Sequence, residues 1–234
     1  MALKAVFIDL GNTLLYEKPS RFGIYADAAR RRGVDLTDDA MQALMRRAHA
    51  ELPREIDGSF RYTDGWFRAY IARIFHAGLG LPLSELASLS EELFAQFSRP
   101  GTFARFPGTD ELLAELRERG LCVGIVSNWS TRLPALLQRL DLARRIDFFL
   151  CSAIERVEKP QAEIFARALR ASGVEPHEAL HAGDDLDKDF VGARTVGIRP
   201  VLVDHARRHT PWDASAGLRV ESLDELRRSI AEIR

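Results

Sequence analysis

The chain has 234 residues, of which 46% are hydrophobic and 29% charged, and its 33 Lys and Arg against 34 Asp and Glu give a formal net charge of −1. This composition excludes an intrinsically disordered chain, and it lacks the basic surplus expected of a nucleic-acid-binding protein. No apolar run approaches the roughly 18 residues of a membrane span, and the N-terminus does not resemble a secretory signal. With Cys122 and Cys151 expected to be reduced thiols, we expect a cytoplasmic protein.

The first predicted element is a strand over residues 5–8, whose side chains are all apolar. A continuous apolar run is typical of a strand buried on both faces of a parallel sheet. Residues 16–98 show no convincing strand and favour four helices that pack as a small bundle. One of these begins after Thr37, an N-cap residue followed by two acidic residues. The four helices are expected at residues 22–32, after Thr37, from Asp64, and over 84–97.

Strands and helices alternate after about residue 100. We expect helices over 109–119, 133–140 and 163–171, and strands over 121–126, 147–150, 179–182 and 200–203. This alternation predicts an α/β fold with a doubly wound, Rossmann-like parallel sheet. Because the helical bundle interrupts the pattern after the first strand, we expect an α/β core domain of residues 1–15 and 99–234. The helical domain is then an insertion of residues 16–98.

Polar residues follow several of these strands or precede the next helix. They are Asp9, Gly11 and Thr13, then Ser127 and Asn128, then Lys159, then Asp184, Asp185 and Asp189. In such sheets ligands bind at the carboxyl ends of the strands, so these residues are expected to converge. Taken singly, Asp9 also fits a turn, Ser127 a helix N-cap and Lys159 a solvated loop. Clustered carboxylates favour a bound cation, and Mg²⁺ prefers oxygen ligands. The histidines show no metal-site spacing, and His181 is expected to be a core residue.

In chain order, four motifs resemble those of the haloacid dehalogenase-like superfamily. They are Asp-x-x-x-Thr at 9–13, Ser-Asn at 127–128, Lys-Pro at 159–160 and Gly-Asp-Asp-x-x-x-Asp at 183–189. The resemblance covers the whole chain, including the place of the helical insertion. It indicates the branch with a helical cap after the first strand, which contains phosphoglycolate-phosphatase-like and 2-haloacid-dehalogenase-like proteins.

The resemblance implies a phosphatase that acts on a small phosphorylated, anionic metabolite. Asp9 would be the nucleophile that forms an aspartyl-phosphate. Lys159 would neutralise charge on the nucleophile and on the phosphoryl group. Three residues would hydrogen-bond the phosphoryl oxygens, namely Thr13, Ser127 and Asn128.

The resemblance also implies a Mg²⁺ site. Asp9, Asp184 and the backbone carbonyl of Gly11 would hold the ion directly. Asp185 and Asp189 would bind it or shape its surroundings. A dianionic phosphate cannot approach the Asp9 carboxylate unless Mg²⁺ and a lysine offset the repulsion.

The sequence departs from the family pattern at Gly11. The usual phosphatase motif is Asp-x-Asp-x-Thr, whose second Asp protonates the leaving oxygen and later activates water. Gly11 occupies that position, and the neighbouring Asn12 has no useful pKa. General acid–base catalysis contributes about 10²–10⁴-fold in rate, so this is the most consequential residue in the chain.

Three functions stay open. The first is a phosphatase whose substrate has a good leaving group, such as an acyl or aryl phosphate, or whose proton comes from Tyr16, Glu17, Asp57, Tyr62 or Asp64. The second is a 2-haloacid dehalogenase, because halide leaves without a proton, although those enzymes do not use Mg²⁺ and lack an acidic motif like that at 184–189. The third is a binding or regulatory protein with low or no activity, since a fold does not by itself deliver a function.

Overall fold

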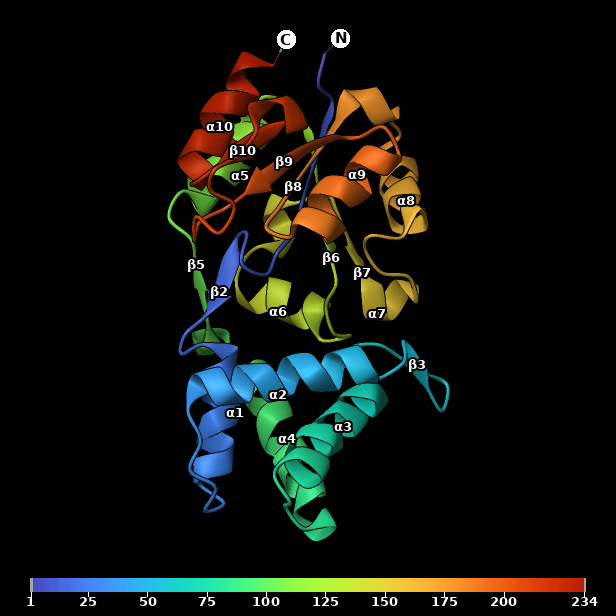
Figure 1. Ribbon diagram of the computed structural model, residues 1–234. Coiled ribbons are helices and arrows are strands. Elements are labelled where there is room, and N and C mark those ends of the chain that lie inside the picture. The colour runs from blue at the N-terminus through green and yellow to red at the C-terminus, as the bar shows by residue number, and fades with distance from the viewer. Residues whose placement is uncertain (1, 234) are drawn as a thin grey trace. The chain divides into compact units, whose positions relative to one another are not determined.

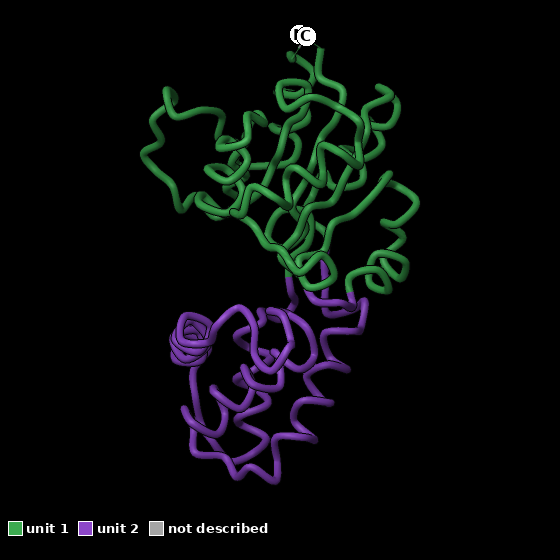
Figure 2. Tube along the Cα trace, turned by 90° about the vertical axis from the view of Figure 1, so that its right-hand side faces the viewer, with its two compact units in different colours: residues 1–16, 105–129, 133–234 green, residues 17–104, 130–132 purple. Residues whose placement is uncertain are grey.

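The computed structural model describes residues 2–233, which divide into two compact units (Figures 1 and 2). The first, here called the α/β unit, takes the chain up to residue 16, residues 105–129, and the chain from residue 133 onward. The second, here called the helical unit, takes residues 17–104 and 130–132. Residues 99–104 and 130–132, which we expected in the α/β domain, therefore group with the helical unit.

A parallel sheet of six strands forms the centre of the α/β unit, in the order β10-β9-β8-β1-β6-β7 (Figure 1). In its middle, Ile8 of β1 lies opposite Ile125 of β6 and Ala182 of β8. Every side chain of β1 is buried, as its continuous apolar run predicts. The predicted fold class is confirmed. The strands are Ala5–Ile8 (β1), Cys122–Ser127 (β6), Phe148–Cys151 (β7), Ala179–Gly183 (β8), Arg199–Val203 (β9) and Leu218–Val220 (β10).

Helices cover both faces of this sheet, with α8 and α9 on one side and α5 and α10 on the other (Figure 1). In α8, Ile164, Phe165 and Ala168 reach the core, and the helix ends at Gly173, whose positive φ of 66° suits a glycine. Each large apolar side chain buried in this way stabilises the fold by about 1.5–3 kcal/mol. The helices are Thr109–Glu118 (α5), Leu133–Arg139 (α6), Ser152–Glu155 (α7), Ala162–Ser172 (α8), Gly192–Thr195 (α9) and Leu223–Glu232 (α10).

The helical unit packs four helices around an apolar core that includes Met41, Trp66 and Phe75. The expected N-cap is present, because the Thr37 side chain accepts a hydrogen bond from the Ala40 N–H at 3.2 Å. The helices are Arg21–Arg30 (α1), Asp38–Glu51 (α2), Asp64–Ala72 (α3), which continues as a π-helical segment Arg73–Gly78, and Leu86–Phe97 (α4). Among the described residues, no helix combines the length and the apolar character needed to cross a membrane.

Several short strands were not predicted from the sequence. The expectation that residues 16–98 hold no strand was wrong, because a two-stranded hairpin turns at Asp57 and Gly58, where φ is 46° and 76°. Strands of two or three residues are too short to show a hydrophobic period, and only Val220 of β10 is buried. The missed strands are Leu15–Glu17 (β2), Glu55–Ile56 (β3), Ser59–Phe60 (β4), Phe103–Arg105 (β5) and β10.

Candidate active site

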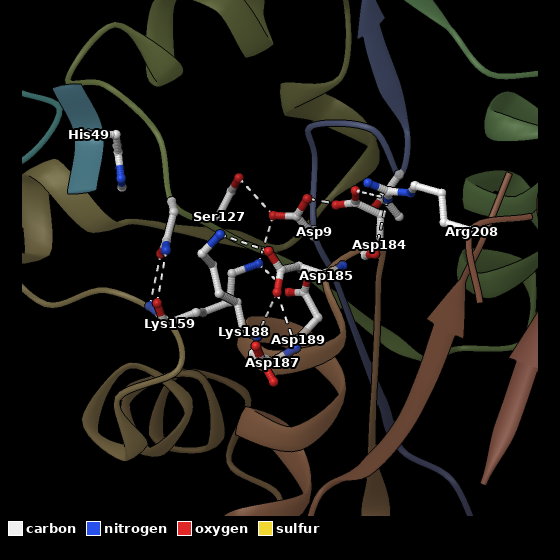
Figure 3. A network of polar contacts seen from close by, with 12 residues as sticks. Asp9, His49, Ser127, Lys159, Asp184, Asp185, Asp187, Lys188, Asp189 and Arg208 are labelled. Carbon is white, nitrogen blue, oxygen red and sulfur yellow. Dashed lines mark hydrogen bonds and ion pairs between the residues drawn. The ribbon is translucent and has the colours of Figure 1, made fainter. Parts of the chain in front are cut away.

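Asp9 follows β1 at the carboxyl edge of the sheet, and only 6% of the residue is exposed. Its backbone N–H donates to the Ala182 carbonyl in β8 at 2.9 Å, which fixes its place at that edge. Carboxylate Oδ1 accepts hydrogen bonds from Ser127 Oγ at 2.9 Å and from Lys159 Nζ at 2.7 Å (Figure 3). Oδ2 accepts a longer one, of 3.5 Å, from the Thr13 hydroxyl. Burial raises the pKa of Asp9, and the attraction of Lys159 opposes that rise.

Lys159 lies between two carboxylates, because its Nζ contacts both Asp9 and Asp189 (Figure 3). The residue is 2% exposed. Burial alone would lower the pKa of Lys159, but the attraction of Asp189 and Asp9 outweighs it and raises that pKa. Asn128 holds the lysine backbone in place: its Oδ1 accepts from the Lys159 N–H at 2.8 Å, and its Nδ2 donates to the Lys159 carbonyl at 2.9 Å. The Asn128 amide, which we expected on phosphoryl oxygens, is therefore engaged with Lys159.

Asp189 comes from a π-helical segment, Leu186–Val191, that follows β8. Its Oδ1 lies 2.8 Å from His181 Nε2, and its Oδ2 accepts from the Asp185 N–H at 3.1 Å. Burial would raise the pKa of Asp189, but Lys159 and His181 lower it, so the side chain stays ionised. A Cβ at Gly183 would collide with the Asp189 carboxyl carbon, so the glycine lets this segment approach the strand.

His181 is a site neighbour that sequence reasoning placed only in the core. It is fully buried in β8, and because side chains alternate along a strand it shares a face with Gly183. Burial lowers the pKa of His181. A neutral ring that donates from Nε2 satisfies Asp189. Gly183 lies two residues later on the same face of β8. A glycine at that position of the sequence indicates that another side chain packs against this face of the strand.

Asp184, the next residue after β8, brings a third carboxylate to the same place. Oxygen atoms of Asp9, Asp184 and Asp189 all lie within 4.8 Å of one another. Burial, together with repulsion from Asp9 and Asp189, raises the pKa of Asp184 to about 7. Arg208, from the loop after β9, pairs with Asp184 Oδ2 at 2.9 Å, and its own N–H donates to Asp204 Oδ1 at 2.8 Å. Arg208 was not predicted, because nothing in the local sequence links it to a residue 24 positions away.

Asp185 lies outside this group of three carboxylates. Its Oδ1 accepts from the backbone N–H groups of Asp187 and Lys188 at 3.1 and 2.9 Å, and its Oδ2 pairs with Lys188 Nζ at 2.7 Å (Figure 3). The side chain therefore caps the segment that carries Asp189. Asp187 is exposed.

Gly11 lies two residues after Asp9, where its backbone bridges to Leu15. An aromatic ring lies against it, since a Cβ added to Gly11 would be 3.0 Å from Cζ3 of Trp129. Gly11, at the position where the phosphatase motif has an acidic residue, therefore lies against the indole of Trp129.

Taken together, the structure brings Asp9, Thr13, Ser127, Lys159, Asp184 and Asp189 to one edge of the sheet. Three carboxylates there face one buried ammonium and one exposed guanidinium. Such a place is suited to a divalent cation and to a reaction in which a carboxylate oxygen attacks an electrophile.

Comparison with known proteins gives a consistent answer. A family model described as haloacid dehalogenase-like hydrolase matches residues 3–197. A human protein named haloacid dehalogenase-like hydrolase domain-containing protein 3 is 30% identical over 200 residues, which is 83% of this chain and 79% of that protein. A phosphoserine phosphatase of Thermus thermophilus is 30% identical over 247 residues, covering 96% of this chain and 98% of that protein.

Solved structures share the fold. A HAD phosphatase from Thermococcus onnurineus superposes with a TM-score of 0.68 at 25% identity, over 99% of both chains. A 2-haloacid dehalogenase from Pseudomonas syringae does so with a TM-score of 0.67 at 23% identity, over 98% of both chains. Because structures of either activity superpose equally well, the fold does not separate the two reactions.

Proposed function

The chain belongs to the family of haloacid dehalogenase-like hydrolases, and we propose that within this family it is a Mg²⁺-dependent phosphatase that acts on a small phosphorylated metabolite. The observation that carries the proposal is the Asp9 carboxylate, held by Ser127 and Lys159 beside two further carboxylates. The phosphoserine phosphatase among the relatives supports a phosphorylated substrate.

The residues fit a magnesium ion by their donor chemistry. Three carboxylates offer oxygen atoms within 4.8 Å of one another, and hard oxygen donors are what Mg²⁺ prefers. The pKa of Asp184 is raised by burial and by repulsion from Asp9 and Asp189, and Arg208 offsets this only in part, so a cation beside the three carboxylates would be stabilising. Asp9, Asp184, Asp189 and, as the family resemblance implies, the Gly11 carbonyl would hold the ion. When bound it would offset charge on the phosphate.

The chain's own residues then perform a two-step displacement. An oxygen of Asp9 attacks phosphorus, the bond to the leaving oxygen breaks, and an aspartyl-phosphate forms. Lys159 stays close to Asp9 and neutralises charge on the phosphoryl group, while the Ser127 and Thr13 hydroxyls donate to its oxygens. Water then attacks phosphorus, which releases inorganic phosphate and restores the Asp9 carboxylate. Asn128 and Asp185 serve this chemistry indirectly, by holding Lys159 and the Asp189 segment.

The test is hydrolysis of p-nitrophenyl phosphate and acetyl phosphate with Mg²⁺. We expect EDTA or Asp9→Asn to abolish turnover, whereas Asp187→Asn, which removes an exposed carboxylate outside the group of three, leaves it unchanged. If no phosphate is hydrolysed in an Asp9-dependent way, the phosphatase proposal is wrong, and either a non-catalytic binding protein or the carbon–halogen hydrolase considered next takes its place.

A second candidate is hydrolysis of a carbon–halogen bond, which needs no proton for the leaving halide. The lack of an ionisable side chain at Gly11 favours it. The three clustered carboxylates argue against it, because a halide-releasing reaction has no use for a cation site. Chloride release from 2-chloropropionate in EDTA would establish this function in place of the phosphatase.

A further inference from the structure

The indole of Trp129 lies next to Gly11 in the loop after Asp9. A Cβ placed on Gly11 would lie 3.0, 3.8 and 3.9 Å from Cζ3, Cε3 and Cη2 of that ring. All three atoms belong to the six-membered ring, so its edge lies where a side chain at position 11 would begin. Gly11 is not in the left-handed region, so its backbone tolerates a side chain, and the nearest atoms that such a side chain would meet are those of the indole.

The backbone of Trp129 is held firmly. Its N–H donates to the Ser152 hydroxyl at 3.2 Å, and its carbonyl accepts from the Cys151 thiol at 3.2 Å and from the Ala153 N–H at 3.4 Å. Ser152 is fully buried and Cys151 ends the edge strand β7. The Trp129 backbone is therefore anchored on a strand and on the first turn of α7, and its side chain is partly buried.

The loop directly after Asp9 carries no acidic side chain that could protonate a leaving group. Residues 10–13, Leu-Gly-Asn-Thr, hold no side chain that titrates near neutral pH. The Asp189 carboxylate is engaged by Lys159 and His181, and Lys159 contacts both Asp9 and Asp189. Asp184 pairs with Arg208 and belongs to the group that would hold the cation. Position 11, two residues after the nucleophile, is therefore bordered by an aromatic ring and carries no acid.

We propose that Trp129 is a specificity-determining residue and that the substrates are aryl or acyl phosphates. This inference rests on the proposed phosphatase function. In both classes the leaving oxygen is attached to a planar π system, so it departs as a stabilised anion without being protonated. The flat group can pack on the indole, as aromatic pairs do. The reaction forms the bond from Asp9 to phosphorus and releases a phenolate or carboxylate. The protons are supplied in the second step, by the water that hydrolyses the aspartyl-phosphate.

The first experiment measures kcat/KM for phenyl phosphates whose phenols differ in acidity, for acetyl phosphate, and for ethyl phosphate. We expect a steep fall in rate as the leaving group becomes more basic, with ethyl phosphate slower by about 100-fold or more, the range that a missing general acid accounts for. Comparing kcat/KM for acetyl phosphate with that for the phenyl phosphates shows whether the enzyme prefers acyl or aryl phosphates. Rates that vary less than tenfold across the series would overturn the inference, since an acid elsewhere would then supply the proton.

The second experiment combines Gly11→Asp with Trp129→Ala. We expect Gly11→Asp alone to raise ethyl phosphate hydrolysis less than tenfold, because the indole fills the space. In the double variant the gain should reach about 100-fold, as the acid gains room to act. Trp129→Phe, which keeps a flat ring, should retain the aryl preference, and Trp212→Ala controls for loss of a tryptophan elsewhere in the α/β unit. Equal gains with and without Trp129 would refute the role of the ring.

A third readout does not depend on activity. Gly11→Ala should lower Tm when Trp129 is present and leave it unchanged in the Trp129→Ala background, because the two groups share one space. If the Tm changes of Gly11→Ala and Trp129→Ala are additive, the two side chains do not share one space. That result would overturn the inference whatever substrate the enzyme hydrolyses. Loss of all Asp9-dependent hydrolysis would instead overturn the proposed function, and the thermal result would still decide whether the ring occupies position 11.

Discussion

The edge of the central sheet and the helical unit both contain ion pairs, but they place them in different surroundings. Lys159 pairs with Asp9 and Asp189 where all three are buried. In the helical unit Arg47 pairs with Glu51 at 2.7 Å, with the arginine side chain 72% exposed. Removing charges from water costs free energy that pairing only partly offsets, whereas an exposed pair contributes about 0–1 kcal/mol.

The buried polar residues show the same contrast. Among the described residues, those buried in the helical unit are uncharged, namely Ser90 and Thr102. The helical unit therefore gains its stability from apolar packing around residues such as Trp66. The α/β unit buries charged side chains at one edge of its sheet, which is unfavourable for stability. Such buried charges are typical of functional sites.

The largest effect should come from Lys159→Met, which leaves Asp9 and Asp189 buried without their cation. We expect the free energy of unfolding to fall by about 3–5 kcal/mol, as when one partner of a buried pair is lost. Phosphate release should fall by about 10²–10³-fold, the range seen when one stabilising group is removed from an active site. Urea denaturation and a steady-state phosphate assay measure the two quantities.

A matched control is Lys188→Met. Lys188 pairs with Asp185 at 2.7 Å, and its side chain is 44% exposed. We expect its loss to change the free energy of unfolding by less than about 1 kcal/mol. Equal losses in the two lysine variants would contradict the distinction between buried and exposed pairs.

His181→Leu should have the next largest effect. It removes the hydrogen bond from Nε2 to Asp189, and bonds to a charged group are worth about 1.5–3 kcal/mol. His181→Gln, whose amide can donate to the same oxygen, should recover part of the stability and of the activity. If the Leu variant unfolds at the same urea concentration as the wild type, the histidine does not support Asp189.

Asp204→Ala tests a buried carboxylate that lies outside the group of three. Asp204 accepts from the Arg208 and His209 N–H groups at 2.8 and 2.9 Å and pairs with Arg219 at 2.9 Å. These contacts lower the pKa of Asp204 against the effect of burial. Leaving the N–H donors unpaired should cost about 1–3 kcal/mol.

The stability lost in Asp204→Ala should depend on pH, because the pKa of Asp204 is lowered in the folded state. The stabilisation is fully present above the unfolded value, near pH 4, and disappears as the pH falls through the lower pKa of the folded state. Urea midpoints of wild type and Asp204→Ala should therefore differ most above about pH 4 and converge in acid. A difference that grows in acid would mean that the carboxylate is not stabilising when ionised.

The smallest effect is expected for Glu51→Gln in the helical unit. Glu51 pairs with Arg47 and Arg73 at the surface, and these arginines lower its pKa. Solvent and salt screen such pairs, so any loss in Tm should be slight and should vanish in high salt. A large loss that persists in 1 M NaCl would show that surface pairs matter more in this unit than the comparison indicates.

The sequence by itself determined the main sheet strands and the residues at their carboxyl ends. Continuous apolar runs predict buried parallel strands, and parallel strands bring their ends to one edge, so Asp9, Ser127, Lys159, Asp184 and Asp189 could be expected together. Both steps depend on local patterns and on one general rule of topology, which is why they could be made without coordinates.

Only the tertiary structure decided which atoms meet. His181 contacts Asp189, Arg208 contacts Asp184 and Trp129 borders Gly11 because strand faces and loop paths, not sequence spacing, set those distances. It also turned the amide of Asn128 to the Lys159 backbone and the carboxylate of Asp185 to a helix end. A side chain's partner depends on rotamer and packing over residues far apart in the chain, and that information is not contained in any local pattern.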